Sequence, residues 1–312
     1  MSFADSHKPR SKSADQSHRF AGRCMVWFVL IVGLSFLPGC AWVLALSGDP
    51  DIESQRLFDK AKIAEQNGES QKAGLLLQRA TEANPDDTEI RRELARWLLE
   101  QGAADAALQQ LRFAVESSPD DVEALVQMAG ILFDEQRDDD IGRPLNAALS
   151  LNSEHVEALM LQAALAERQG RETLALETYH RVLLHHPEHM AARLRVAQIQ
   201  VHWERPAQAT PMLRAVCDCP DATPDQKAEA RWVLGVAFAQ QQRWQDAAQA
   251  LAAAAPQRRH MRADDWYQLA YVRYQTGDHN AAWSDLGTAL RFNPRHQDAL
   301  TMANVLRRQQ RR

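Results

Sequence analysis

A four-residue turn recurs every 34 residues through the middle of this 312-residue chain, and this period restricts the possible folds more than any other feature. Copies of the turn begin at Asn84, Ser118, Asn152 and His186, and a further copy begins at Asn293. Proline stands second in most copies, and it ends a helix because its ring clashes with the preceding turn and its nitrogen carries no hydrogen. A period of this length predicts a stack of helical hairpins rather than a domain with one central core.

Small apolar residues keep one register between these turns. In the first helix of each predicted unit they are Ala61, Ala95, Ala129, Ala163, Ala197, Gly235 and Ala270. In the second helix the matching positions are Ala73, Ala107, Ile141, Ala175, Ala209, Ala247 and Ala282. Small side chains let two helices approach closely, so the register predicts seven helix–turn–helix units. Their expected bounds are 54–87, 88–121, 122–155, 156–189, 190–223, 228–261 and 263–296.

This pattern resembles the tetratricopeptide repeat (TPR), a 34-residue helix–turn–helix unit with small and large apolar residues at fixed positions. The last unit is the most similar, with Trp266, Leu269, Ala270, Gly277, Ala282, Leu286, Ala289 and Pro294. Glycine stands in the turn between the two helices, where positive φ is tolerated, at Gly68, Gly102, Gly170 and Gly277. The resemblance implies an all-α, right-handed solenoid of about seven repeats in residues 54–296.

Solenoids need a cap over the apolar face of the last repeat. Residues 297–312 are expected to form a capping helix, in which the apolar positions are Ala299, Leu300, Ala303 and Leu306. These side chains would cover the end of the seventh repeat while the arginines of the same helix face water.

Two segments depart from the regular period. Four extra residues lie between the fifth and sixth repeats, within Cys217–Pro224, and predict a bend at that point. In the fifth repeat, Trp203–Pro206 replaces the usual turn glycine, which predicts a tightened or distorted hairpin.

The N-terminal part of the chain carries a membrane signal. Residues 1–23 form a polar, basic tail that we expect to be disordered, and 47–53 form a linker to the repeats. Between them, Met25–Leu46 contains no charged residue, so residues 24–46 are long enough to cross a bilayer as a helix. Positive charge before this segment and acidic residues after it predict a cytoplasmic N-terminus and repeats on the far side of the membrane, which is the periplasm in a bacterium.

A second interpretation of the same segment is a lipoprotein signal. Leu37–Cys40 resembles the bacterial lipobox, in which cleavage precedes a cysteine that carries lipid. The match is partial, because Pro38 is atypical and Ala41–Leu46 stays apolar. An uncleaved anchor, or attachment through a lipidated Cys40, therefore remain alternatives at this stage.

Charge argues against nucleic acid as the partner. The chain has a formal net charge of −5, and its repeat body is acidic while its last quarter is basic. Neutralising phosphates along the array would need a continuous positive surface. The expected partner is another protein or peptide.

The first helix of each repeat is expected to line a concave binding face, as the resemblance to TPR superhelices implies. Aromatic residues gather there near the C-terminus, at Trp232, Tyr267, Tyr271 and Tyr274. Tyrosine combines a broad apolar ring with a polar tip and low rotamer entropy, which suits the grip of a peptide or helix. The alternative is that these rings pack against neighbouring repeats.

Two basic residues of the early repeats occupy the same predicted face. Arg92 and Arg96 would pair with an acidic group of a partner, or else are ordinary solvated surface charges.

Few residues are candidates for metal binding or catalysis. Four histidines fall close together, at His180, His185, His186 and His189. Zinc sites combine such pairs with cysteine or carboxylate in a fixed geometry, whereas these histidines occupy variable turn positions. Cys217 and Cys219 are either free thiols or form a strained or intermolecular bridge. We expect no cofactor and no enzyme activity, because the chain has no phosphate-binding loop and no nucleophile elbow.

These observations predict a membrane-tethered adaptor that binds a partner polypeptide on its concave face, in the assembly of a cell-envelope complex. The alternative is a receptor for a metal ion, a glycan or another small ligand, which would use the histidine cluster His180–His189 or the C-terminal aromatic face.

Overall fold

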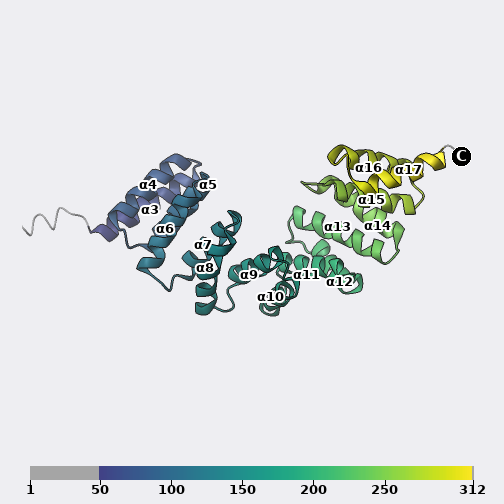
Figure 1. Ribbon diagram of the computed structural model, residues 1–312. Helices are drawn as coiled ribbons and strands as arrows, with labels where there is room; N and C mark the ends of the chain where they lie inside the picture. Colours follow the sequence, from purple (N-terminus) through teal and green to yellow (C-terminus); the bar gives the residue numbers. More distant parts are fainter. Residues whose placement is uncertain (1–48, 311–312) are drawn as a thin grey trace, which may run out of the picture. The chain divides into compact units, whose positions relative to one another are not determined.

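The computed structural model describes residues 49–310, and every regular element in this range is helical (Figure 1). Fifteen α-helices and one short 3₁₀ helix are present between these residues, and no strand occurs there. Consecutive helices pack as hairpins, and the hairpins follow one another along the chain. The predicted all-α class is confirmed.

Seven hairpins and one final helix make up this array. Their bounds are α3 (Pro50–Gln66) with α4 (Ser70–Ala83), α5 (Thr88–Glu100) with α6 (Ala104–Ser117), α7 (Val122–Asp134) with α8 (Asp138–Leu151), α9 (Val156–Arg168) with α10 (Glu172–His185), α11 (Met190–His202) with α12 (Pro206–Asp218), α13 (Pro224–Gln240) with α14 (Trp244–Ala254), α15 (Ala263–Gln275) with α16 (His279–Phe292), and α17 (Gln297–Gln310). The 3₁₀ helix η2 (Ala255–Gln257) follows α14 directly.

The chain divides into two compact units, one up to Ile90 and one from Arg91 onward. In the first unit α3 packs against α4, and the buried side chains include Phe58, Ala61 and Leu77. Ala61 and Ala73, the small-residue positions that the repeat register predicts for this hairpin, are both buried.

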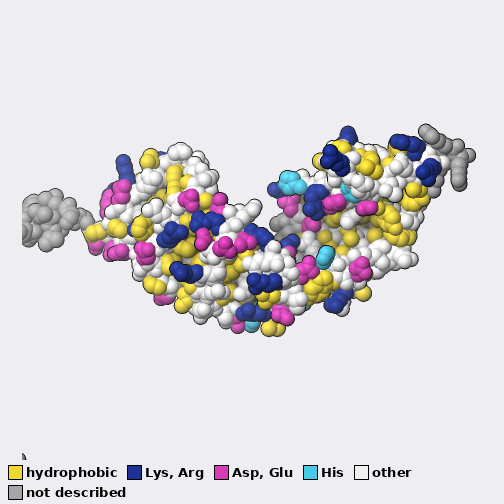
Figure 2. Space-filling view, viewed as in Figure 1, with side chains coloured by type: hydrophobic (Ala, Val, Ile, Leu, Met, Phe, Trp, Pro, Cys, Tyr) yellow, Lys and Arg dark blue, Asp and Glu magenta, His cyan; other side chains and the backbone are white. Residues whose placement is uncertain are grey.

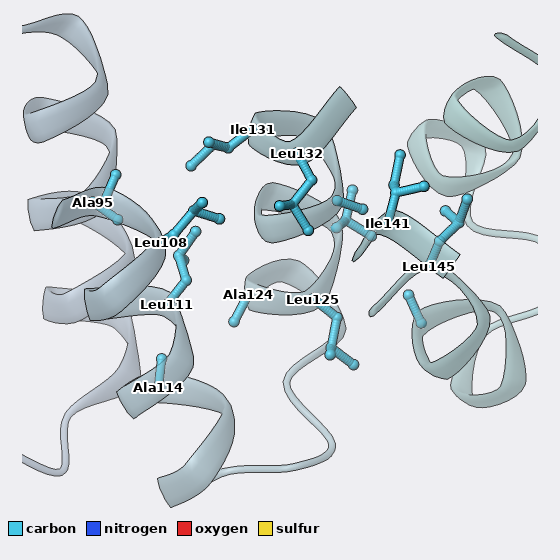
Figure 3. Close-up of a cluster of buried hydrophobic side chains, with 14 of the residues drawn as sticks. Ala95, Leu108, Leu111, Ala114, Ala124, Leu125, Ile131, Leu132, Ile141 and Leu145 are labelled. Carbon is cyan, nitrogen blue, oxygen red and sulfur yellow. The ribbon is translucent and has the colours of Figure 1, made fainter. Parts of the chain in front are cut away.

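In the second unit the core is a succession of local clusters, each shared by neighbouring hairpins. Figure 3 shows the first of them, where Leu108 and Leu111 of α6 lie opposite Ala124 and Ile131 of α7. Such a layered core is typical of solenoids, in which each repeat contacts only its neighbours.

Every hairpin between residues 49 and 310 has the same turn geometry. One residue per turn is in the left-handed region, at Gly68 (φ 77°), Gly102 (75°), Gln136 (56°), Gly170 (71°), Glu204 (55°), Gln242 (56°) and Gly277 (84°). The predicted distortion at Trp203–Pro206 is therefore wrong, because Glu204 adopts the conformation that glycine has elsewhere. Pro206 fits directly after it as the first residue of α12, where a missing N–H is tolerated.

The four extra residues between the fifth and sixth repeats lengthen a helix. Helix α13 begins at Pro224, four residues before the expected start of the repeat at 228. Thr223 caps it, because its hydroxyl accepts from the Gln226 N–H at 3.2 Å and the Gln226 side chain accepts from the Thr223 N–H at 2.9 Å. The insertion thus supplies the first turn of α13 together with its cap.

The start of the first helix and the buried face of the last helix both differ from the prediction. Helix α3 begins at Pro50, inside the expected linker 47–53, because the Asp49 side chain accepts from the Asp51 N–H at 3.2 Å and caps it. In α17, Leu300 is exposed, and Met302 is buried instead beside the predicted Ala299, Ala303 and Leu306.

The predicted basic tail 1–23, the predicted membrane segment 24–46 and Cys40 lie outside the described residues. Within 49–310, no helix combines the length and the apolar character needed to cross a bilayer.

Candidate functional site

An apolar groove lies between the first helices of the last two hairpins, α13 and α15. Its volume is about 510 Å³. The residues that line it are Val236, Ala239, Gln240, Gln242, Trp244, Leu251, Tyr267, Gln268, Tyr271 and Val272. None of these ten residues carries a charge, and we call the cavity the aromatic groove. Figure 2 shows hydrophobic side chains concentrated over α13 and α14.

Aromatic rings form a continuous row along one wall of the aromatic groove. The centroids of Trp244 and Tyr271 are 5.9 Å apart at an interplanar angle of 79°, an edge-to-face contact. Tyr271 lies 6.3 Å from Tyr267, which in turn lies 5.1 Å from the ring of His296. Tyr271 remains 39% exposed in the middle of this row, so a ligand can reach it.

Tyr267 stays a neutral phenol at physiological pH. Burial, and then the nearby Asp298 carboxylate, raise the pKa of its hydroxyl above the ordinary value. The groove therefore offers hydroxyl and carboxamide groups for hydrogen bonds but no ionised group of its own.

A second cavity of about 370 Å³ continues from the aromatic groove toward α11. It shares Val236, Gln240 and Gln268 with the groove, and we call it the polar trough. Its further lining residues are Gln198, Val201, His202, Glu204, Glu229, Trp232, Val233, Arg258, Arg262 and Asp265.

Two carboxylates of the polar trough, Glu229 and Asp265, are held by donors of the same chain. The Gln198 amide donates to one oxygen of Glu229 at 3.1 Å, and Arg258 donates to the other oxygen at 2.9 Å. Arg258 also lies 3.4 Å from an oxygen of Asp265, whose second oxygen accepts from the Arg262 backbone N–H at 2.8 Å. Each of these carboxylate oxygens thus has a donor before any ligand arrives.

This hydrogen-bonded chain extends to the preceding hairpin. Arg195 on α11 donates to Gln198 at 3.0 Å and pairs with Glu167 on α9. Tyr179 on α10 interacts with the same group, and burial raises its pKa to about 12. Side-chain hydrogen bonds and the ion pair between Arg258 and Asp265 therefore connect four successive hairpins.

The predicted aromatic residues separate into two groups. Tyr267 and Tyr271 line the aromatic groove as expected. Trp232 is only 4% exposed, and its ring lies under the Arg258 guanidinium at 4.5 Å, so it belongs to the core and to the floor of the trough. Tyr274 lines neither cavity and lies 5.2 Å from the ring of His279.

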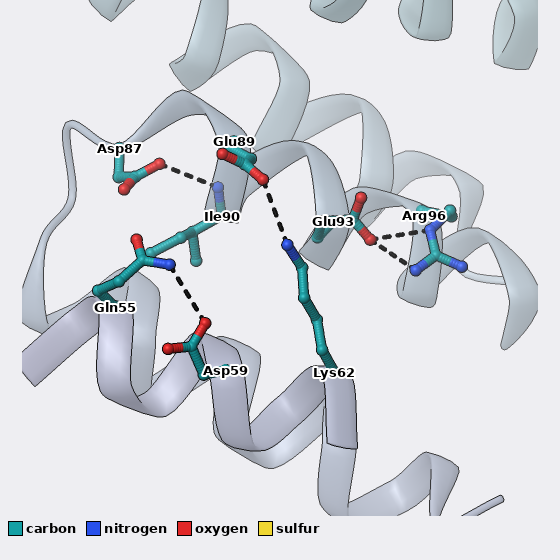
Figure 4. Close-up of polar contacts among 8 residues, drawn as sticks. All are labelled: Gln55, Asp59, Lys62, Asp87, Glu89, Ile90, Glu93 and Arg96. Carbon is teal, nitrogen blue, oxygen red and sulfur yellow. Dashed lines mark hydrogen bonds and ion pairs between the residues drawn. The ribbon is translucent and has the colours of Figure 1, made fainter. Parts of the chain in front are cut away.

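The two predicted arginines are paired within their own chain. Arg96 contacts Glu93 at 2.5 Å on the same helix α5 (Figure 4). It also lies 3.3 Å from Glu100 of that helix. Arg92 lies 3.3 Å from Asp121. These contacts favour the interpretation of Arg96 as a surface charge, whereas Arg92 is largely buried, with 23% of its side chain exposed.

The four histidines do not converge. His189 caps α11, since its Nδ1 accepts from the Ala192 N–H at 3.1 Å. His185 and His186 lie near Glu154 (3.6 Å) and Glu188 (3.7 Å), and His180 is exposed.

One group of potential metal ligands was found in residues 49–310, at Glu123, His155 and Glu157, and it includes none of the predicted histidines. His155 caps α9 through Nδ1, which accepts from the Ala158 N–H at 3.4 Å, and its Nε2 lies 3.1 Å from Glu123. The imidazole thus already has structural partners on both nitrogens.

Cys217 and Cys219 are free thiols, both partly buried against the core of the fifth and sixth hairpins. Burial raises the pKa of Cys217, which disfavours its thiolate.

The sequence-based prediction contained only aromatic residues for this part of the site, and it therefore did not include several residues that line the aromatic groove. Trp244 is the first residue of α14, directly after the turn, outside the helix positions that the repeat register assigns to the binding face. Val236, Ala239 and Gln240 lie on α13, the first helix of its repeat, but they are not aromatic. Their place on a first helix is the sequence signal that indicates these three residues as part of the binding face.

Comparison with known proteins bears on the fold. A family model described as tetratricopeptide repeat matches residues 58–140 and 221–263. A search of curated proteins found no match.

Three similar solved structures all share low sequence identity with this chain, so the likeness concerns the fold alone. A tetratricopeptide repeat protein from Parabacteroides merdae has a TM-score of 0.58 at 15% identity, covering 81% of this chain and 98% of its own. PilW, described as a type IV pilus biogenesis factor, has a TM-score of 0.57 at 18% identity, with coverages of 69% and 97%. YrrB, described as a TPR protein with an unusual peptide-binding site, has 0.50 at 21% identity, with coverages of 62% and 97%.

Proposed function

Since this chain belongs to the tetratricopeptide repeat family, we propose that it is a scaffold that holds a partner polypeptide in the aromatic groove between α13 and α15. Members of this family act as protein-interaction scaffolds. The observation that carries the proposal is the groove itself, because it joins a row of aromatic rings, exposed at Tyr271, to a cavity lined by uncharged residues.

The size and surface of the aromatic groove suit a polypeptide ligand. Its volume of about 510 Å³ falls inside the range of roughly 300–1,000 Å³ that is usual for ligand sites. Tyrosine and tryptophan supply much contact area for little loss of rotamer entropy, which is why they dominate the centres of protein interfaces. Tyr271 and Trp244 are suited to that role.

The cellular setting that we propose is the bacterial envelope, with the chain tethered through residues 24–46 and the repeats on the periplasmic side. The uncharged run after a basic tail supports this setting. The likeness in fold to PilW, which is described as a pilus biogenesis factor, is compatible with a role in assembling an envelope complex.

Affinity capture from membranes tests the scaffold role. Full-length protein with Tyr271→Ala should lose most of a specifically crosslinked partner, because Tyr271 is the exposed centre of the aromatic row. Tyr274→Ala is the matched control, since it removes the same ring from the same helix but outside both cavities. Equal capture by the two variants would exclude the groove as the site, and the absence of any specific protein in the wild-type capture would argue against a scaffold.

Metabolic labelling with radioactive palmitate tests how the chain is tethered. Label that is present in the wild type and lost in Cys40→Ser would establish the lipoprotein alternative. Membrane retention of an unlabelled, full-length chain is the result expected for an uncleaved anchor.

A further inference from the structure

Building on the proposed function, we infer that the groove selects an extended, uncharged segment of its partner, anchored by one aromatic or large aliphatic side chain against Tyr267 and Tyr271. Charged segments are excluded by the same surface. This specifies the chemistry of the partner, which the scaffold role alone leaves open.

The first argument is the absence of charge among the ten residues that line the groove. In the whole sequence 25% of residues are charged, yet the lining consists of aliphatic, aromatic and carboxamide side chains. An ionised side chain that enters such a cavity loses its hydration and gains no counter-ion there. The unfavourable desolvation therefore discriminates against charged residues, which is specificity by exclusion.

The second argument is that the polar trough beside the groove offers little compensation. Glu229 and Asp265 are already bonded by Arg258 and by amide donors, as described above. The exposed charges at its edge are of both signs, Glu204 and Arg262. The whole trough carries three carboxylates and two arginines, a formal charge of −1, so it offers no compensating charge to an acidic residue of the partner and a single net negative charge to a basic one.

The third argument concerns the peptide backbone of the ligand. Gln240 and Gln268 line both cavities, at the point where the groove meets the trough. Gln240 is held in place because its Nε2 donates to the Val201 carbonyl oxygen at 2.8 Å. A carboxamide has both donor and acceptor groups, so these two side chains match the alternating N–H and C=O of an extended chain regardless of its sequence.

These three features divide the recognition between two parts of the surface. The aromatic row supplies affinity through one anchor side chain, while the carboxamides hold neighbouring backbone. The result is a site that distinguishes the partner by the polarity of a short segment rather than by a charged motif.

Selection from a phage-displayed library of random dodecapeptides on the purified full-length protein tests this inference. Enriched peptides should contain an aromatic or large aliphatic residue and should be depleted of Asp, Glu, Lys and Arg around it. Tyr271→Ala should weaken their binding about tenfold or more, as expected for a central interface residue, whereas Tyr274→Ala should leave it unchanged.

A charge inserted into the groove provides the sharper arm of the test. Gln268→Glu should weaken the selected peptides about tenfold and should improve the binding of variants that carry Lys beside the anchor, whereas Gln268→Asn should change binding far less. Circular dichroism and thermal unfolding confirm that each variant is folded.

The outcomes separate the two proposals. Peptides that bind through Tyr271 but carry charged residues at the anchor would overturn the inferred partner chemistry and leave the scaffold role in place. Binding that is indifferent to both Tyr271→Ala and Gln268→Glu, or no enrichment at all, would overturn the groove as the binding site and with it both proposals.

Discussion

The Cγ atom of Leu251 lies 2.6 Å from the point that a Cβ atom on Gly235 would occupy. This contact between α13 and α14 explains why the sixth hairpin has glycine where the other first helices have alanine. The backbone N of Leu251 is only 3.1 Å from the same point, so the two helices approach more closely here than a methyl group allows.

Gly235→Ala should therefore destabilise the protein by about 1–3 kcal/mol, the usual result of overpacking a filled core. Gly130→Ala is the matched control, because Gly130 also lies inside a first helix but has no atom within 4 Å of its Cβ position. That change should stabilise α7 by roughly 0.5–1 kcal/mol, since alanine restricts the unfolded chain. Chemical unfolding followed by circular dichroism measures both, and equal effects would contradict the close approach.

Glu204→Gly should stabilise the fifth hairpin by roughly 0.5–1 kcal/mol. Glu204 has φ 55°, a conformation that costs a residue with a Cβ about 1–2 kcal/mol and costs glycine far less. The reverse change, Gly102→Ala at φ 75°, should destabilise the second hairpin by a similar amount. Thermal unfolding distinguishes the two, and a lower midpoint for Glu204→Gly would show that its side chain compensates for the strain.

Alkaline pH should weaken the protein through Tyr179. Its pKa is raised to about 12 by burial, whereas the same group in the unfolded chain titrates near 10. Between these values the folded state keeps a proton that the unfolded state releases, so this contribution to stability is complete below pH 10 and is lost as pH rises toward 12.

Urea unfolding at several pH values between 8 and 11 measures this dependence. Tyr179→Phe should flatten the decline with pH in addition to any constant loss from the missing hydroxyl. Parallel curves for the two proteins would assign the alkaline loss to other groups.

Arg258→Ala should cost about 3 kcal/mol or more. The guanidinium lies over Trp232 and pairs with Asp265, whose side chain is only 8% exposed, so its removal leaves a carboxylate buried without a counter-ion. Arg259→Ala is the control on the adjacent residue, since that side chain is 77% exposed and its pair with Asp225 should contribute less than about 1 kcal/mol. Similar unfolding midpoints for the two variants would argue against a structural role of Arg258.

The sequence predicts the helices of this fold well because the repeat register states the same information seven times. The sequence-based prediction is wrong where it relied on a residue type, such as glycine in the turn, rather than on a position in the repeat. Glycine suggested the turn in four hairpins, but Gln136, Glu204 and Gln242 show that the turn is imposed by the packing of the two helices. The bend expected at Cys217–Pro224 stays a prediction, but Thr223 and Pro224 in the same segment are start signals of a helix that the sequence analysis did not recognise.

The candidate site was only partly predictable for a related reason. Tyr267 and Tyr271 follow from the register, but the register does not show that Trp232 is buried in an apolar cluster under Arg258, a residue of the connection after η2. Trp244 was missed because it begins a second helix, and only the packing of α14 against α15 brings its ring to Tyr271.

The layered core of the second unit has a consequence for how this protein would come apart. A series of local clusters unravels from a terminus inward, because the last layer is supported on one side only. The aromatic groove is built on α15, close to that vulnerable end, and its row of rings reaches His296 at the start of α17. A bound partner would therefore slow proteolysis of α16 and α17, so occupancy would be readable as resistance to degradation at the C-terminus.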